Sequence, residues 1–242
     1  MTGYLDTLAG DLRRAAPEPA RGFADALREG PHVAVIAELK RASPSAGSIA
    51  PDADVASTAR AYAGGGAAAM SVLCAPRDFG GSLADLTAAR AASPLPALAK
   101  DFTVFPQTVA AQRLAGADAV LVILALVTDD EAARLMQTAD LLGMDVLVEA
   151  HDARELERAA GLEAQVVGVN ARDLRTLEVN RERQLELLGR VHPGAVRVAE
   201  SGISSAADVA EARDAGADAV LVGTALMRSP ELLSELAEVP RR

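Results

Sequence analysis

The sequence is poor in the residues on which several protein classes depend. It has one cysteine, Cys74, so no disulfide can form within the chain, and a reducing compartment such as the cytoplasm is expected. Tryptophan is absent and aromatic residues make up only 2% of the chain, so the core must come from Ala, Val, Leu and Ile. No apolar run reaches about 18 residues, and Met1 to Gly10 lacks the basic-then-apolar pattern of a secretory signal. We therefore expect neither a membrane-spanning helix nor export.

Positive charge is scarce as well. The net charge of −10 argues against nucleic acid or an anionic membrane as a partner, although a small anionic ligand needs only a local cationic site. Lysine is much rarer than arginine, because the chain has two lysines, Lys40 and Lys100, and 22 arginines. Arginine keeps its proton at physiological pH, whereas a lysine can be tuned to release it. Composition alone leaves two readings open: a codon-biased host with two leftover lysines, or two sites that need an amine.

An internal repeat predicts the fold. The eight letters AGADAVLV occur at Ala115 to Val122 and again at Ala215 to Val222, with weaker relatives at Gly65 to Leu73 and Ala160 to Asn170. In each, a helical run ends at Gly and a short β-branched run follows, which is typical of alternating helices and strands. The predicted strands are Val33 to Lys40, Ala67 to Leu73, Pro96 to Phe102, Ala119 to Leu124, Asp145 to Ala150, Val166 to Asn170, Val196 to Ser201 and Ala219 to Gly223.

Eight such strands in 242 residues favour a single (β/α)8 TIM barrel of the α/β class, which needs roughly 250 residues. A doubly wound open sheet is the structural alternative. We predict one domain over residues 1–242, in which residues 1–31 form a short N-terminal extension with helices at Tyr4 to Ala15 and Glu18 to Glu29. This extension is expected to cap the barrel or to border its active-site mouth. Helix N-caps are predicted at Thr128, Ser204 and Ser229.

Polar residues cluster at the C-terminal ends of the predicted strands, the rim at which barrel enzymes place their chemistry. Both lysines of the chain lie on this rim, which favours a functional role for them over a remnant. Buried Lys–Glu pairs can also be purely structural, Asp101 can cap the turn that follows it, and Asn170 can be a turn residue. The rim residues are Glu38, Lys40, Lys100, Asp101, Glu149, Asn170, Glu200 and Ser201.

A phosphate site is predicted in the loops after the seventh and eighth strands. Gly202, Gly223 and Thr224 lie there, where backbone N–H groups can approach an anion. No dinucleotide-binding or Walker motif occurs, so no cofactor is expected. His32, His151 and His192 lack the spacing of metal ligands, and we interpret all three as non-catalytic and Cys74 as an inert core residue.

The rim motifs together resemble those of the indole-3-glycerol phosphate synthase family of tryptophan biosynthesis. The resemblance extends from about His32 to Pro230, and its most specific parts are E-x-K-x-x-S-P-S, which begins at the end of the first strand, and KDF at the end of the third. Further matches are MSVL with FGGSLADL, GADAVLVI, LVEAHD, VGVNARDL, VAESGI and LVGTALMRSP. The resemblance implies a lyase that converts 1-(2-carboxyphenylamino)-1-deoxyribulose 5-phosphate to indole-3-glycerol phosphate, CO2 and water, without metal or cofactor.

The resemblance also implies roles for single residues. Lys100 would be the principal general acid, Lys40 would hold the substrate carboxylate and serve in dehydration, and Glu149 would be a base or proton partner. Glu38 would form an ion pair with the lysines. Asn170, Glu200 and Ser201 would position the substrate, and further binding residues would be Ser43, Phe102, Arg172, Gly202, Gly223 and Thr224. A lysine that is partly desolvated near other cations is expected to have a lowered pKa.

Several positions depart from the common family pattern: Cys74, Ala99, Ala171 and Thr224. Tyr4 and Phe23 are the only candidates for the aromatic contact that the family's N-terminal region makes with substrate. These departures leave open a paralogue of specialised indole metabolism, while another phosphate-binding barrel isomerase and a non-catalytic barrel are the remaining alternatives. The sequence is compatible with a monomer and leaves association with other tryptophan-pathway enzymes open.

Overall fold

The computed structural model describes residues 10–11 and 18–242. Apart from Gly10 and Asp11, the helix predicted over Tyr4 to Ala15 lies outside the described residues, and so does Tyr4 itself. Among the described residues, no helix has the length and apolar character needed to cross a lipid bilayer.

Eight parallel strands close into a barrel, in the order β1-β10-β9-β8-β7-β6-β5-β4, with β1 paired to both β10 and β4. The predicted (β/α)8 barrel is therefore confirmed, and the open-sheet alternative is wrong. A short antiparallel hairpin of β2 (Ala42–Ser43) and β3 (Gly47–Ser48), which was not predicted, lies in the loop after β1. The barrel strands are β1 (Ala34–Leu39), β4 (Ala69–Leu73), β5 (Ala97–Lys100), β6 (Ala119–Ile123), β7 (Asp145–Ala150), β8 (Val166–Asn170), β9 (Val196–Glu200) and β10 (Ala219–Val222).

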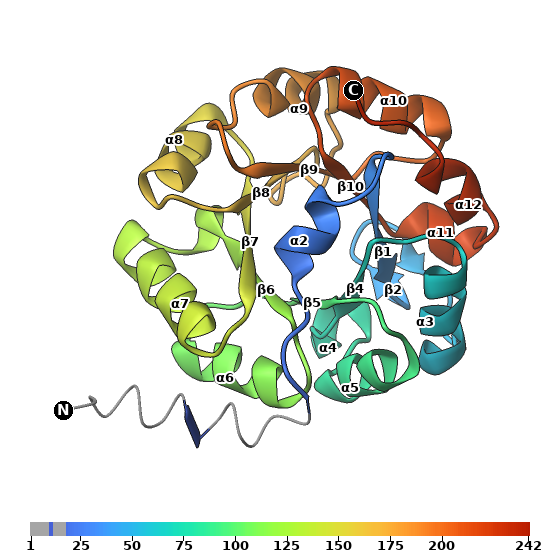
Figure 1. Ribbon diagram of the computed structural model, residues 1–242, viewed down its shortest axis with the longest axis horizontal. Helices are drawn as coiled ribbons and strands as arrows, with labels where there is room; N and C mark the ends of the chain where they lie inside the picture. The colour runs from blue at the N-terminus through green and yellow to red at the C-terminus, as the bar shows by residue number, and fades with distance from the viewer. Residues whose placement is uncertain (1–9, 12–17) are drawn as a thin grey trace.

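Helices surround the barrel as an outer ring (Figure 1). They are α3 (Val55–Gly64), α4 (Pro76–Phe79), α5 (Leu83–Ala92), α6 (Pro106–Leu114), α7 (Asp129–Leu141), α8 (Ala153–Gly161), α9 (Arg181–Leu188), α10 (Ala206–Asp214), α11 (Thr224–Arg228) and α12 (Leu232–Ala237), with a 3-10 turn η1 (Leu124–Leu126) after β6. Thr128 caps α7 through a capping box, as predicted. The other two predicted caps are wrong: Ser205 rather than Ser204 caps α10, and Ser229 ends α11 instead of starting α12.

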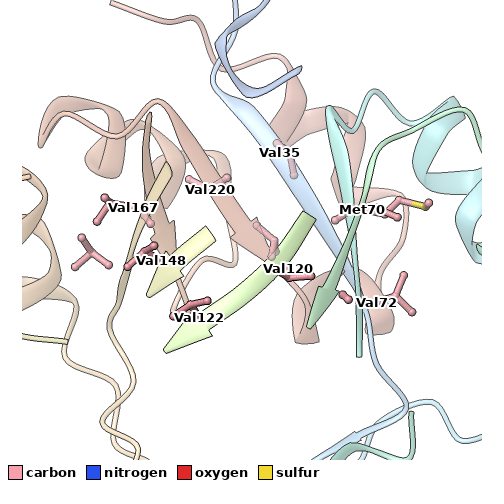
Figure 2. Packing of buried hydrophobic residues seen from close by; sticks show 14 of the residues in the cluster. Val35, Met70, Val72, Val120, Val122, Val148, Val167 and Val220 are labelled. Atoms are coloured by element: carbon pink, nitrogen blue, oxygen red, sulfur yellow. The ribbon is translucent and has the colours of Figure 1, made fainter. Parts of the chain in front are cut away.

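Side chains alternate along each strand between the barrel interior and the helical ring. Ile36, Leu98 and Leu147 belong to an interior cluster, whereas the cluster of Val35, Val120 and Val220 faces the helices. Figure 2 shows the latter three among the buried side chains that pack there. On β1, β5, β7 and β9, the inward residue that follows the apolar interior cluster is charged. The same alternation therefore directs Glu38, Lys100, Glu149 and Glu200 into the barrel at its C-terminal end.

Helix α2 (Phe23–Arg28) closes the opposite end of the barrel. It lies across the barrel centre in Figure 1, and Phe23 and Leu27 are fully buried in the interior cluster. The backbone N–H of Ala24 donates to Asp145, which begins β7. The extension therefore caps the barrel through this helix, and Phe23 is wrong as a substrate contact because it lies at the end away from the predicted site.

The predicted helix over Glu18 to Glu29 is also too long, because α2 begins only at Phe23. The preceding residues are extended and are held by side chains of the barrel instead. Glu18 accepts a hydrogen bond from Arg90 at 2.7 Å, and the Arg21 backbone N–H donates to Asp118 at 2.7 Å. The Arg21 N–H is a backbone group that a helix would otherwise have bonded internally, and Asp118 satisfies it instead.

Candidate active site

A cavity of about 730 Å³ opens at the C-terminal ends of the strands. Apart from the aromatic candidates Tyr4 and Phe23, it brings together the residues that the sequence singled out for catalysis or substrate binding: Glu38, Lys40, Ser43, Lys100, Phe102, Glu149, Asn170, Arg172, Glu200, Ser201, Gly202, Gly223 and Thr224. Both lysines therefore face one space, together with the glycine turns after β9 and β10.

Lys100 is the centre of the buried charges. Its Nζ lies 2.8 Å from Glu149 Oε2 and 2.7 Å from Glu200 Oε2, and both carboxylate side chains are only 2% exposed. Burial acts to lower the pKa of Lys100, but Glu149, Glu200 and Glu38 outweigh it and hold this pKa above its usual value. The expectation of a lowered lysine pKa is thus wrong for the free site, because carboxylates rather than cations surround the amine. In the free site, Lys100 is therefore a charged ammonium near neutral pH.

The two carboxylates on Lys100 differ in protonation. Burial acts to raise the pKa of Glu149, yet Lys100 and His151 hold it well below its usual range. Burial and the nearby charge of Glu149 instead raise the pKa of Glu200 to about 7, against the attraction of Lys100. Two carboxylates that share one ammonium cannot both ionise easily, so their pKa values separate. Near neutral pH, Glu149 is ionised and Glu200 is close to its titration midpoint.

Glycines make room for these side chains. A Cβ on Gly168, which faces inward on β8, would lie 2.0 Å from Glu200 Oε1. A Cβ on Gly223 would lie 2.3 Å from Glu38 Oε1 and 2.9 Å from Lys40 Nζ. Each glycine therefore leaves the volume that a buried charged group occupies.

Lys40 forms the second ion pair of the mouth, with Nζ 2.7 Å from Glu38 Oε1. The backbone of Glu38 is fixed from outside the barrel, because the buried Tyr62 hydroxyl donates to its carbonyl oxygen at 3.1 Å. The pair lies beside Gly223, in the part of the cavity nearest the loop after β10.

Asn170 links the base to the loop after β8. Its Nδ2 donates to Glu149 Oε1 at 3.1 Å, and its Oδ1 accepts from the Arg172 backbone N–H at 2.9 Å. The sequence left a turn residue and a site residue as alternatives; the side chain bonds the turn and also lines the cavity, while its role in the reaction stays a prediction. The Arg172 guanidinium in turn donates to the Leu177 carbonyl at 2.8 Å, which fixes it at the cavity wall.

The turn after β9 adopts an uncommon backbone. Ser201 and Gly202 both have positive φ, at 69° and 76°, and a non-glycine residue in this region is strained. Arg181 donates to the Gly202 carbonyl at 2.9 Å and holds the turn in place. Gly202, Gly223 and Thr224 thus present backbone from two adjacent loops to the cavity.

The outer part of the cavity is apolar, in contrast to the charged residues deeper inside it. Phe102 is 43% exposed, with its ring centroid 6.2 Å from that of Phe79, and Leu126 and Leu174 also line the cavity with exposed side chains. Asp101 Oδ1 accepts from the Phe102 backbone N–H at 2.9 Å, which matches its predicted role in the turn. A planar apolar group can bind at this rim while an anion reaches the glycine turns.

Sequence reasoning missed His151. Its Nε2 lies 3.1 Å from Glu149 Oε1, although the two atoms are not aligned for a regular hydrogen bond, and its Nδ1 lies 3.1 Å from Glu155 Oε2. The signal was present in the sequence, because His151 stands two residues after Glu149 and four before Glu155. In the described part of the chain, no group of three His, Cys, Asp or Glu residues could hold a metal ion.

The fold and the site define a barrel enzyme of the acid–base type, with a mouth suited to an anionic substrate that carries an apolar ring. The family model of indole-3-glycerol phosphate synthase matches residues 5–239. The chain belongs to this family, whose members are decarboxylating lyases of tryptophan biosynthesis.

Similar proteins agree with this assignment. An indole-3-glycerol phosphate synthase of Beutenbergia cavernae is 50% identical over 208 residues, covering 86% of this chain and 77% of that protein. Indole-3-glycerol phosphate synthase 2 of Streptomyces coelicolor is 49% identical over 219 residues, covering 90% and 84%. Solved structures with 15% identity share the fold alone. Thiamine phosphate pyrophosphorylase of Pyrococcus furiosus has a TM-score of 0.61 over 86% of this chain and 93% of that chain, and a mandelate oxidase has 0.62 over 95% and 89%.

Proposed function

We propose that this chain closes the indole ring of indole-3-glycerol phosphate with Lys100 as the general acid. The substrate is 1-(2-carboxyphenylamino)-1-deoxyribulose 5-phosphate, and the products are indole-3-glycerol phosphate, CO2 and water. The observation that carries the proposal is the position of Lys100, a buried ammonium that contacts two carboxylates on the cavity floor. Proton donation to the sugar carbonyl makes its carbon more electrophilic toward the aromatic ring.

The other ionisable groups of the cavity each take part in one of the remaining steps. Lys40 holds the substrate carboxylate until it leaves as CO2 and assists the loss of the hydroxyl group, with Glu38 orienting its ammonium at 2.7 Å. Glu149 accepts protons, because its low pKa and its contact with Lys100 keep it ionised. Glu200 shares the proton of Lys100, while Asn170 and Ser201 position the substrate.

Binding of the substrate uses both parts of the mouth. Gly202, Gly223 and Thr224 receive the phosphate through backbone N–H groups, and Arg172 adds positive charge. Phe102 packs against the anthranilate ring, while Ser43 lies buried in the hairpin wall of the cavity. The ligand is a small anion, so we propose neither nucleic acid nor membrane as a partner, and we place the reaction in the cytoplasm of the cell.

The test is incubation with the carboxyphenylamino-deoxyribulose phosphate while indole absorbance and fluorescence are followed. We expect Lys100→Ala and Lys100→Arg each to lower turnover by ~10²–10⁴-fold, because neither residue can donate this proton. Arg60→Ala, on an exposed face of α3, is the control and should retain activity. Near-normal activity of either Lys100 variant would refute the general-acid role.

The same assay separates the alternative functions. Failure of the wild-type protein to form indole product would favour a paralogue of specialised metabolism or a non-catalytic barrel. An isomerase of a related phosphate-binding barrel would instead release no CO2. The sequences at 45–50% identity that are named indole-3-glycerol phosphate synthase support the ring-closing reaction over isomerisation.

A further inference from the structure

His151 joins the buried base to the protein surface. Its ring lies between Glu149, whose side chain is 2% exposed, and Glu155, whose side chain is 13% exposed, and the histidine side chain is itself 14% exposed. The Glu155 carboxylate makes two contacts with the histidine: its Oε2 lies 3.1 Å from the ring Nδ1 and accepts the His151 backbone N–H at 2.7 Å. Glu149, His151 and Glu155 therefore form a chain of ionisable groups from the cavity floor toward solvent.

Carboxylates from three elements act on the ring, and the Lys100 ammonium lies on the far side of one of them. Glu149 comes from β7, Glu155 from α8, and Asp173 from the loop between β8 and α9. Burial acts to lower the pKa of His151, but Glu149 and Glu155 outweigh it and raise this pKa to about 10. The ring is thus an imidazolium at neutral pH, whereas an unperturbed histidine would be mostly neutral.

This imidazolium makes the two carboxylates on Lys100 unequal. Glu149 Oε1 faces His151 and the Asn170 amide, and its Oε2 contacts Lys100. Glu200 contacts Lys100 through Oε2, but its buried Oε1 accepts no hydrogen bond from the described residues. The histidine therefore helps to select Glu149 as the ionised member of the pair.

The reaction itself requires proton uptake. The bond to the substrate carboxylate breaks and leaves its electron pair on the ring carbon, and the departing hydroxyl group takes a proton to become water. The charge of the carboxylate is lost with neutral CO2, so each turnover consumes one proton from solvent. Lys100 and Glu149 line the cavity, and their side chains are only 13% and 2% exposed.

We propose that His151 is a positioning residue that acts through Glu149: its imidazolium keeps Glu149 ionised beside Lys100 and returns a proton to Lys100 after each turnover. This inference rests on the proposed roles of Lys100 and Glu149. In the return step, the imidazolium Nε2–H bond breaks and an O–H bond forms on Glu149, which passes its proton to the neutral Lys100 amine. The imidazole then regains a proton from water on the Glu155 side.

The order of proton affinities supports this direction. In the free site the pKa of Lys100 lies above its usual value, while that of His151 is about 10. A neutral Lys100 amine therefore takes a proton from the imidazolium in a downhill transfer.

The first test measures the contact without turnover. The chain has three histidines, so NMR of protein labelled at histidine ring carbons resolves three titrations. We expect one ring to stay protonated above pH 8, and we expect Glu149→Gln to return that ring toward pH 6.5. Three titrations near pH 6.5 in the wild-type protein would overturn the proposal.

The second test is kinetic. We expect His151→Gln to lower kcat by about 10–10²-fold with little change in KM, because the residue does not line the cavity. Loss of the imidazolium raises the pKa of Glu149, so the acidic limb of the kcat/KM profile should move to higher pH. Added imidazole should partly restore kcat to His151→Ala. His32→Gln, an exposed histidine before β1, is the matched control and should leave both constants unchanged.

The outcomes separate this proposal from the proposed function. A wild-type protein that forms no indole product refutes the ring-closing activity, while the NMR titration still reports on the contact. A wild-type rate and an unshifted acidic limb in His151→Gln would refute the role of His151 and leave the role of Lys100 intact. A slow variant that imidazole does not rescue and whose pH profile is unchanged would also contradict it, because that pattern is expected of a purely structural residue.

Discussion

Gly168→Ala tests whether the position of the Glu200 carboxylate determines activity. The added Cβ would lie 2.0 Å from Glu200 Oε1 and 3.1 Å from Glu200 Cδ. Carbon and neighbouring heavy atoms normally stay about 3.5 Å apart, so Oε1 must move by roughly 1.5 Å. Glu200 Oε2 lies 2.7 Å from Lys100 Nζ, and a displacement of this size breaks that contact or drags the lysine with it.

The cost of this displacement should appear mainly in turnover. A misplacement of about 1 Å in a catalytic group can cost ~10²-fold, so we expect kcat to fall by about that factor. Crowding in a packed interior typically costs about 1–3 kcal/mol, which thermal unfolding would measure. Gly161→Ala is the matched control, because nothing lies within 4 Å of its Cβ position at the end of α8, and it should retain full activity.

A double-mutant cycle identifies the cause. Once Glu200→Ala has removed the carboxylate, the alanine at position 168 no longer meets Oε1, and it should cost little further activity or stability. Full activity of Gly168→Ala alone would show that catalysis does not depend on where Glu200 lies. Equal losses in the two backgrounds would show that the substitution acts through the β8 backbone rather than through Glu200.

Three further predictions concern charge and burial. The pKa of Glu200 is raised from 4.5 to about 7, so between these pH values the folded state binds more protons than the unfolded state. The free energy of unfolding should therefore fall as pH rises through that range. Glu200→Gln should flatten this dependence on pH when it is measured by chemical denaturation. Asp118→Ala should cost about 3–5 kcal/mol in thermal unfolding, because it removes the buried partner of Arg90 Nε and the acceptor of the Arg21 and Ala97 backbone N–H groups. Asp129→Ala should cost under about 1 kcal/mol, since its ion pair with Arg158 is exposed. Burial raises the pKa of Cys74 to about 12, so a thiol reagent should label the native protein far more slowly than the unfolded one.

Strand alternation explains why so much of the site was predictable. Leu98 and Lys100, or Leu147 and Glu149, are two residues apart on one strand, so a buried inward position predicts that the polar residue after it also points into the barrel. Strand direction then places all such residues at the same end, because every strand of the barrel is parallel. Periodicity alone therefore predicts a common cavity for residues as far apart in the chain as Glu38 and Glu200.

The features that sequence reasoning missed depend on contacts between distant segments. Helix α2 starts late because Arg90 and Asp118 bind the residues before it, and no local pattern near Glu18 indicates those partners. His151 was interpreted as non-catalytic because metal spacing was the only pattern considered for the histidines. The spacing of Glu149, His151 and Glu155 was a usable signal, but it does not by itself give the 3.1 Å separation between His151 and Glu149.

The proposed mechanism also predicts that Lys100 cannot be exchanged for the arginine used elsewhere in the chain. Glu38, Glu149 and Glu200 surround Lys100 so closely that an arginine would satisfy the same charges, and binding alone would favour its five donors. The difference lies in what happens when the substrate carbonyl competes for a proton. A lysine can release its proton as charge moves toward the substrate and regain it afterwards, whereas a guanidinium cannot. On the proposed mechanism, the demand for proton release, rather than for positive charge, favours an amine at position 100.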